Sequence, residues 1–358
     1  MSTGTPISAA CHTPSGRTFR RAARERELLE TDHDVLVTLH RFTLATAEQL
    51  HQLHGGAAGI KQTQKRLTRL QAEGLAELVT LPQAGRAKAW HLTAAGSAVT
   101  ATFPEALRPT APAPSSENPA VQHGREHLLD IGRIHAAFVT DARTRGEACG
   151  PLDLVPAPEL PTGAEVYRPA AHLAYTAGTG DERHRQRAFI ERHRPGVGDE
   201  QTAAQLAACA RVWEQDGEGG AGRAWERRWR SFPRLLVVLV GTGAAQVRPV
   251  MADLRLAAEE NTAVAELLAT VPAGAARIED LVQRGPSAPI WHSLGARGVR
   301  VDGAVGGRGA GTAKGRPERG PPRHSATNDY ESRWPGRTRR SQRQEITDTA
   351  SRPGGTRF

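Results

Sequence analysis

Residues 46–92 carry the pattern that most restricts the fold of this chain. A short helix is expected over residues 46–53, because Thr46 is a favourable N-cap and the apolar positions that follow it fall on one face. Two consecutive glycines then break the helix. A second helix is expected over Ile60–Glu73, with Gly74 closing its C-terminus. Two short helices in this order predict a helix-turn-helix.

The residues that follow predict a β-hairpin. Leu75–Thr80 alternates as a strand does, Pro82–Lys88 supplies a glycine-containing turn, and Ala89–Leu92 supplies the returning strand. Another helix is expected from Thr93, and Arg21–Arg41 has helical periodicity ahead of the helix pair. The combination predicts a winged helix-turn-helix.

The outer face of the second predicted helix is rich in cations and in amide and hydroxyl groups. Cations in that position suit the phosphates of DNA, and amide and hydroxyl groups can reach base edges in the major groove. The candidate DNA-binding residues are Lys61, Gln62, Gln64, Lys65, Arg66, Thr68 and Arg69 on the helix, and Arg86 and Lys88 on the hairpin. The same face also fits a solvated helix in a protein-binding module.

Strands and helices alternate in the second half of the chain. An amphipathic helix is expected over His127–Val139, and the run Leu235–Val240 is apolar on both faces, as a central strand of a covered sheet is. The other expected elements are strands at Leu152–Val155, Ala171–Tyr175 and Arg187–Glu191 and helices at Gln201–Glu214 and Pro249–Leu268. Strand 187–191, helix 201–214 and strand 235–240 predict a βαβ unit.

These patterns predict an α+β protein with five segments. They are a disordered N-terminus (1–20), a winged-helix DNA-binding domain (21–101), a Pro-rich linker (102–120), an α/β domain (121–294) and a disordered Gly/Arg-rich tail (295–358). The formal net charge of +9 favours an anionic partner. The tail contributes much of it, since residues 301–358 hold 12 Lys or Arg against 6 acidic residues.

The order of these elements resembles the replication–relaxation family of actinobacterial plasmids and integrative elements, over residues 31–250. The matching motifs in the first half are Asp32–Leu36, Thr46–Leu50, Gln64–Leu70 with Glu73–Leu75, and Trp90–Gly96. Those in the second half are His127–Gly132, Arg168–Pro169, Phe189–Glu191 and Gln205–Ala210.

The resemblance implies a restriction-endonuclease-like second domain, in which carboxylates hold Mg²⁺ against a phosphodiester. Ala170 stands where the family pattern has its first Asp, and Glu191-Arg-His193 stands where it has Glu-x-Asp. One carboxylate is left, flanked by Arg192 and Arg194, with which Glu191 is expected to pair. We therefore expect a degenerate nuclease domain without a catalytic residue, metal or cofactor.

Two other kinds of chemistry are disfavoured by the residues. His123 and His127 match a His-x-x-Glu-His zinc pattern, but no third ligand stands out. The tyrosines are Tyr167, Tyr175 and Tyr330, and no His-x-His accompanies them, as a strand-transferring relaxase would need. Trp225 and Trp229 in an Arg-rich segment fit packing under a charged surface better than base stacking.

The expected function is non-catalytic, DNA-binding support of the replication, or its control, of a plasmid or integrative element. The expected partner is double-stranded DNA, with a possible homodimer through helix Pro249–Leu268, no membrane, and a cytoplasmic, nucleoid-associated location. A winged-helix transcriptional regulator and a metal-dependent nuclease are the alternatives.

Truncation after Gly295 tests the tail. The tail lacks the apolar residues that a core needs, so its removal is expected to leave the melting temperature unchanged. A net charge of +8 is lost, since residues 296–358 hold 14 Lys or Arg against 6 acidic residues, so the affinity for non-specific DNA is expected to fall. Thermal unfolding and fluorescence anisotropy measure the two effects. A drop of several degrees in melting temperature would contradict the assignment.

Overall fold

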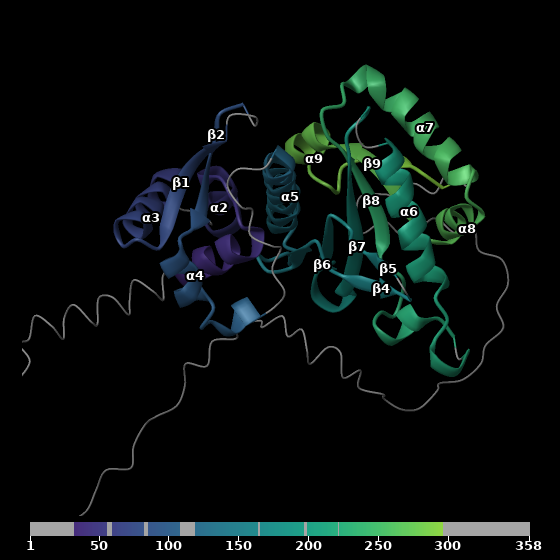
Figure 1. The fold of residues 1–358 in the computed structure, drawn as a ribbon, viewed down its shortest axis with the longest axis horizontal. Helices are drawn as coiled ribbons and strands as arrows, with labels where there is room; N and C mark the ends of the chain where they lie inside the picture. Colours follow the sequence, from purple (N-terminus) through teal and green to yellow (C-terminus); the bar gives the residue numbers. More distant parts are fainter. Residues whose placement is uncertain are drawn as a thin grey trace, which may run out of the picture. The chain divides into compact units, whose positions relative to one another are not determined.

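The computed structural model describes residues 32–55, 59–81, 85–107, 119–163, 165–196, 199–220 and 222–295 (Figure 1). The predicted disordered N-terminus, the tail from residue 296 onward and residues 108–118 of the predicted linker lie outside the described residues. The same holds for residues 21–31 of the first predicted helix, of which residues 32–42 are described as helical.

The helix pair and the hairpin expected from the sequence are present. The helix over residues 32–42 is followed by α2 (Ala47–His54), α3 (Ile60–Ala72), β1 (Ala76–Leu81), β2 (Ala87–Leu92) and α4 (Ala94–Thr100). Thr46 caps α2 as predicted, since its hydroxyl accepts from Gln49 N at 3.2 Å and Gln49 Oε1 accepts from Thr46 N at 2.8 Å. The antiparallel hairpin begins two residues earlier on its second strand than the sequence indicated.

One small apolar core holds these elements together. Its buried residues are Val35, Leu36, Leu39, Ala45, Leu50, Leu67, Leu70, Ala76 and Trp90. They come from the helix over residues 32–42, from α2 and α3 and from both strands, as the helical and strand periodicities predicted. Fully burying side chains of this size stabilises a fold by roughly 1.5–3 kcal/mol each.

The rest of the described chain is built on a mixed sheet. Its elements are α5 (Pro119–Thr144), β3 (Leu154–Pro156), β4 (Leu160–Thr162), β5 (Glu165–Tyr167), β6 (Ala171–Ala177), β7 (His184–His193), α6 (Asp199–Glu214), β8 (Arg234–Leu239), α7 (Val247–Glu259), α8 (Thr262–Thr270), β9 (Ala273–Arg277), α9 (Ile278–Arg284) and β10 (His292–Ser293). Short 3₁₀ helices cover Pro104–Leu107, Gly180–Glu182, Glu218–Gly220, Ala224–Arg227 and Ala244–Gln246.

Within the described residues, six strands lie in the order β10-β9-β8-β7-β6-β3. The strands β3, β6 and β7 are antiparallel, whereas β7, β8 and β9 are parallel to one another. The predicted βαβ unit is confirmed as β7-α6-β8, with β8 buried on both faces. The chain is thus α+β in class, as expected.

Helices cover both faces of the sheet. Residues of α5 and α9 pack on one face, where Ile134, Phe138 and Leu281 join Ile190 and Leu236 in a buried cluster. Residues of α6, α7 and α8 pack on the other face with Phe189 and Val237. Figure 1 shows the two groups of helices on either side of the strands.

The second half differs from the sequence prediction in several parts: α5 begins at Pro119, inside the predicted linker, rather than at His127, and α9 and β10 were not expected. The single helix expected over Pro249–Leu268 is two helices, because Asn261 accepts from Val264 N at 3.3 Å and caps a new helix, α8. The strand β9, rich in Ala and Gly, lacks the β-branched residues that mark strands and was missed. The hairpin of β4 and β5 was missed because each strand has three residues.

The helix pair is fastened to the sheet through α5. The Gln49 side chain donates from Nε2 to the carbonyl of Leu129 at 2.7 Å. A Cβ at Gly132 would lie 3.0 Å from the Gln49 side chain, so the missing side chain permits this close approach. Arg143 donates to the carbonyls of Gln52 and Leu53 in the last turn of α2. These bonds satisfy carbonyls that a helix end leaves without partners.

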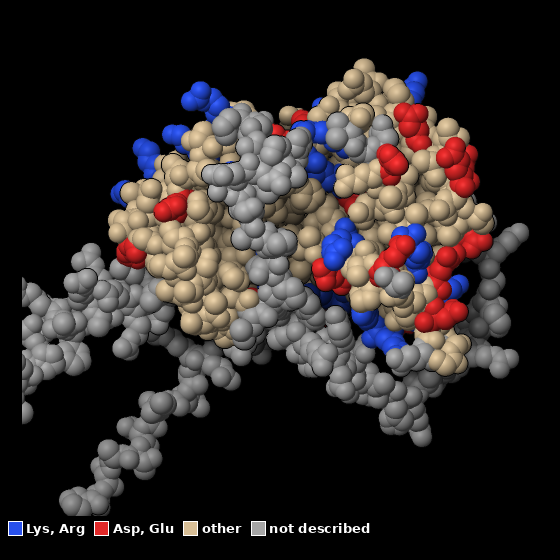
Figure 2. Space-filling model, viewed as in Figure 1, with Lys and Arg blue, Asp and Glu red and all other residues tan. Residues whose placement is uncertain are grey.

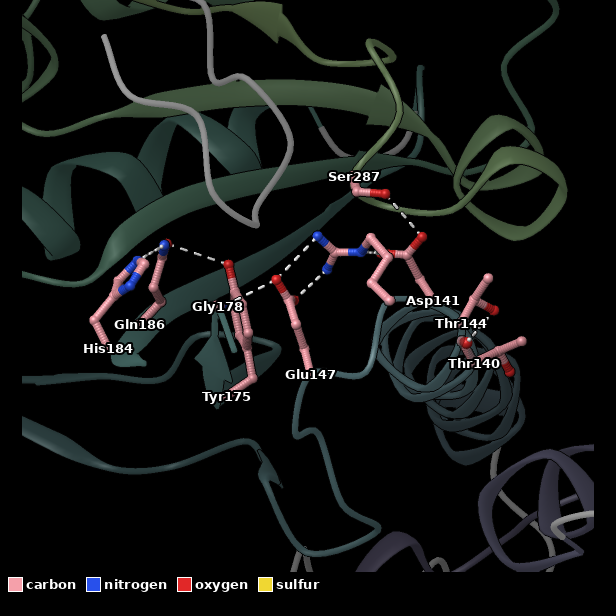
Figure 3. Close-up of polar contacts among 10 residues, drawn as sticks. Thr140, Asp141, Thr144, Glu147, Tyr175, Gly178, His184, Gln186 and Ser287 are labelled. Atoms are coloured by element: carbon pink, nitrogen blue, oxygen red, sulfur yellow. Dashed lines mark hydrogen bonds and ion pairs between the residues drawn. The ribbon is translucent and has the colours of Figure 1, made fainter. Parts of the chain in front are cut away.

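The C-terminal end of α5 is fastened in turn to the sheet and to the loop after α9 (Figure 3). Asp141 Oδ2 accepts from Arg145 Nε at 3.1 Å, and Asp141 Oδ1 accepts from Ser287 Oγ at 2.8 Å. Arg145 also pairs with Glu147, whose Oε1 accepts from Gly178 N at 3.0 Å. The C-terminal end of α5, against which α2 packs, is therefore held both by the loop after α9 and by the residue that follows β6.

Gly96→Ala tests the packing of α4 against the hairpin. A Cβ at Gly96 would lie 1.9 Å from the carbonyl oxygen of Leu75, so the backbone has to shift. We expect the variant to lose about 2 kcal/mol or more of unfolding free energy, as overpacked cores do. Gly124→Ala is the matched control, because no atom lies within 4 Å of its Cβ position in α5. It is expected to gain about 1 kcal/mol through helix propensity. Equal stability of the two variants in urea unfolding would contradict this packing.

Candidate nucleic-acid interface

The outer face of α3 is exposed as the sequence predicted. Its exposed members are Lys61, Gln62, Gln64, Lys65 and Thr68, while Leu67 and Leu70 on the opposite face are buried. The helix begins at Ile60, after the N-cap Gly59, and has no acidic residue in its first turn. Thr68 donates its hydroxyl to the carbonyl of Gln64 at 3.0 Å, which leaves the oxygen able to accept.

Arg66 and Arg69 lie beside this face but have an intramolecular partner. Arg66 Nε lies 2.9 Å from Asp32 Oδ1, and Arg69 pairs with the other carboxylate oxygen. Asp32 is fully buried at the start of the helix over residues 32–42. A buried carboxylate needs such partners, because desolvation of an unpaired charge costs several kcal/mol. The two arginines therefore hold α3 against the helix over residues 32–42, a role that the sequence did not indicate.

The hairpin brings two further candidate residues to one place. Arg86 and Lys88 are exposed at the turn and at the start of β2. Arg86 has a φ of +60°, a left-handed conformation in the turn. Figure 2 shows basic side chains along the outer edge of the part formed by α3 and the hairpin.

Two polar contacts that sequence analysis missed link α2 to α3 and to the helix over residues 32–42. His51 Nδ1 and the buried Thr63 Oγ1 lie 3.1 Å apart and link the two helices. Thr38 Oγ1 and His54 Nε2 lie 2.8 Å apart and link α2 to the helix before it. Burial lowers the pKa of His54 to about 4. In the sequence, these contacts could have been suspected only from Thr63, a polar residue on the apolar face of its helix.

The positions compared with nuclease carboxylates also come together, on the sheet face that α6 covers. Glu191 on β7 accepts a hydrogen bond from the Tyr167 hydroxyl at 2.6 Å and one from the backbone of Ala170. His193 Nδ1, two residues along the strand, lies 2.9 Å from Thr202 Oγ1 on α6. Both side chains are buried, with 4% and 1% of their surface exposed.

Burial changes the chemistry of Glu191. Desolvation raises the pKa of its carboxyl group to about 8, even though the hydrogen bonds from Tyr167 and Ala170 act in the opposite direction. The side chain is therefore mainly protonated at neutral pH. A neutral carboxyl group enclosed by an aromatic side chain is a poor ligand for Mg²⁺.

The pairing expected between Glu191 and a neighbouring arginine is wrong. Arg192 Nε donates to Asp130 Oδ2 at 2.8 Å, and Arg194 Nη1 donates to Glu126 Oε2 at 3.1 Å. Both acids lie on α5, on the other side of the sheet from α6. Because side chains alternate along a strand, Arg192 points away from Glu191.

Other candidate chemistry finds little support in the geometry. Among the described residues, no group of three or more His, Cys, Asp or Glu could hold a metal ion. His127 is largely buried, and burial together with Arg192 lowers its pKa to about 4. Trp229 is buried against Phe189 and Phe232, as the packing interpretation predicted. None of the helices described here is long and apolar enough to cross a membrane.

The structure thus defines a mixed α+β protein. Its helix pair and hairpin pack on an α/β sheet domain, and one face of α3 is exposed and basic. Residues 36–155 match the family model described as replication-relaxation. This match confirms the resemblance to the replication-relaxation family over these residues, which make up about a third of the chain. No curated protein and no solved structure matches the chain.

The buried carboxyl group gives a prediction on pH. Because the pKa of Glu191 is higher in the folded state than the ordinary value of 4.5, the folded state holds the proton more tightly. Stability from this group is complete below about pH 4.5 and declines up to about pH 8, with a slope of at most about 1.4 kcal/mol per pH unit. In Glu191→Gln this decline is expected to disappear. Urea unfolding of both proteins from acid to mildly alkaline pH measures it, and parallel curves would contradict the raised pKa.

Proposed function

We propose that this protein binds double-stranded DNA through a winged helix-turn-helix and supports, without catalysis, the replication of a plasmid or integrative element or its control. In this proposal α3 lies in the major groove and the hairpin is the wing. The observation that carries the proposal is the exposed face of α3, where Lys61 and Lys65 accompany three amide or hydroxyl side chains. Arg86 and Lys88 supply charge for the flanking phosphates.

The family match supports a role in replication, but it does not identify the residues that would contact DNA. It covers residues 36–155 and so includes α2, α3, the hairpin and α5. The description of the family names replication and relaxation. A DNA-binding module in such a protein is a natural means of reaching the replicating molecule.

The absence of catalysis is proposed from Glu191 and its surroundings. In a degenerate restriction-endonuclease-like domain the meander β3-β6-β7 and the parallel strand β8 would correspond to the nuclease core. Ala170 supplies only a backbone group to Glu191, and His193 is engaged with Thr202. This arrangement supports a structural role for the three positions.

A transcriptional regulator is the second candidate, because such proteins commonly act as dimers. Leu256 on α7 is 59% exposed, and it marks a place where a second copy could pack. Sedimentation of the full chain, with and without Leu256→Glu, separates a dimer through α7 from a monomer. A mutation-sensitive dimer would favour the regulator.

The direct test changes Lys61 and Lys65 to Ala and leaves Arg66 and Arg69 in place. The two arginines are excluded because their loss would leave Asp32 buried without a partner. We expect affinity for duplex DNA to fall and the slope of log K against log salt to decrease by about 2, one unit for each lost phosphate contact. Fluorescence anisotropy over a salt series measures the slope.

The control for this test is R248A/R255A, which removes two exposed cations from α7. It is expected to keep the slope of the unchanged protein. Equal slopes for all three proteins would remove α3 from the interface. Metal-dependent nicking of supercoiled plasmid that is lost in Glu191→Gln would overturn the non-catalytic part.

A further inference from the structure

The amino-terminal half of β7 and the segment before β8 carry a second group of cations. Arg183, Arg185 and Arg230 are exposed, and Arg187 and Arg228 are half-buried. We refer to these five residues as the arginine surface. Neither the expected DNA-binding residues nor the family match includes them, since the match ends at residue 155.

An aromatic cluster brings the two segments together. Phe189 of β7 contacts Trp229 and Phe232 edge-on, with ring centroids 5.5 and 5.7 Å apart. Arg185 and Arg187 lie before Phe189 on the same face of β7, since alternate residues of a strand share a face and are about 7 Å apart. Arg228 and Arg230 flank Trp229 in sequence, so these four cations lie near one cluster, and Arg183 immediately precedes β7.

The surroundings of His172 support this proximity. Its ring lies 5.6 Å from the ring of Phe189 and 6.2 Å from that of Trp229. Burial lowers the pKa of His172 to about 3, and Arg187 and Arg185 lower it further through their charge. The histidine is therefore neutral, and the surface charge comes from the arginines.

Acidic groups also lie beside the arginine surface in the described part of the chain. Asp153 lies 3.9 Å from Arg185, while Asp181 and Glu226 are exposed at the margins. The Glu226 carboxylate is engaged with the backbone N–H of Arg223 at 3.2 Å. Figure 2 shows basic side chains in the lower part of the sheet domain in that view, with acidic side chains next to some of them.

We propose that the arginine surface is a second contact site for duplex DNA, which binds the phosphate backbone independently of α3. This inference rests on the proposed DNA binding and adds a site to it. The chemistry is that of the backbone, because arginine binds phosphate oxygens through paired N–H donors. Base stacking is disfavoured, since Trp229 is buried and Trp225 donates Nε1 to the carbonyl of Trp213 at 3.2 Å.

The test compares R183A/R230A with R248A/R255A in the full chain. Each variant removes two exposed arginines from the sheet domain, and Arg248 and Arg255 lie on α7. On a duplex of about 40 base pairs, we expect the salt slope to fall by about 2 in R183A/R230A and to stay unchanged in the control. R183K/R230K is expected to keep the slope, because lysine also contacts phosphate.

The outcomes separate this inference from the proposed function. A reduced slope in K61A/K65A with an unchanged slope in R183A/R230A overturns the second site and leaves the first. Failure of the unchanged protein to bind duplex DNA removes both. Loss of single-stranded DNA or RNA binding alone in R183A/R230A also overturns the duplex assignment. Thermal unfolding confirms that each variant folds, and if R183A/R230A does not, R230A alone is expected to lower the slope by about 1.

Discussion

The packing of α2 on α5 is the contact on which the rest of the structure depends. Gln49 serves twice in it, accepting from the N-terminus of its own helix and donating to the carbonyl of Leu129. Phe42 and Leu53 from the N-terminal part are buried in the same cluster as Ile131 and Ile134 of α5 and Ile190 of the sheet. The helix pair therefore has a small core of its own and also shares an apolar core with the sheet, alongside the polar contacts of Gln49 and Arg143.

Charge is used in two different ways around α3. Arg66 and Arg69 share one buried carboxylate and fix the helix in place, whereas Lys61 and Lys65 extend from it into solvent. A buried ion pair contributes less net stability than its Coulomb energy suggests, because both ions lose hydration. Its clearer effect here is geometric. Arg66 and Arg69, one turn apart on α3, each contact one oxygen of Asp32, and this restricts rotation of α3 about its axis.

Local signals were sufficient for much of the fold. The N-cap at Thr46 and the glycine at the end of α2 specify that helix from neighbouring residues alone, and the apolar run at Leu235–Val240 specifies a strand. Both elements are present, as α2 and β8. The break at Asn261 and the strand β9 were missed, because a cap inside an apolar run and a strand of Ala and Gly depend on tertiary packing.

The candidate site shows the same limit. The exposed face of α3 follows from helical periodicity, and its members were predicted. That Asp32 would pair with Arg66 and Arg69, that Tyr167 would bind Glu191, or that Arg192 would reach Asp130 could not be predicted. Along the sequence, Tyr167 and Glu191 are 24 residues apart, Asp130 and Arg192 are 62 apart, and Asp32 and Arg69 are 37 apart. Only the folded chain brings these residues together.

The shared core has a consequence for how such proteins can diversify. A recognition module joined by an open linker can be exchanged between relatives as a cassette, because few contacts cross the boundary. Here a transplanted α2 would have to bring its own Gln49 and meet Gly132 and Arg143 on the recipient's α5. New DNA specificity is therefore most accessible through single substitutions on the outer face of α3, whereas recombination would have to move α5 and the helix pair as one block.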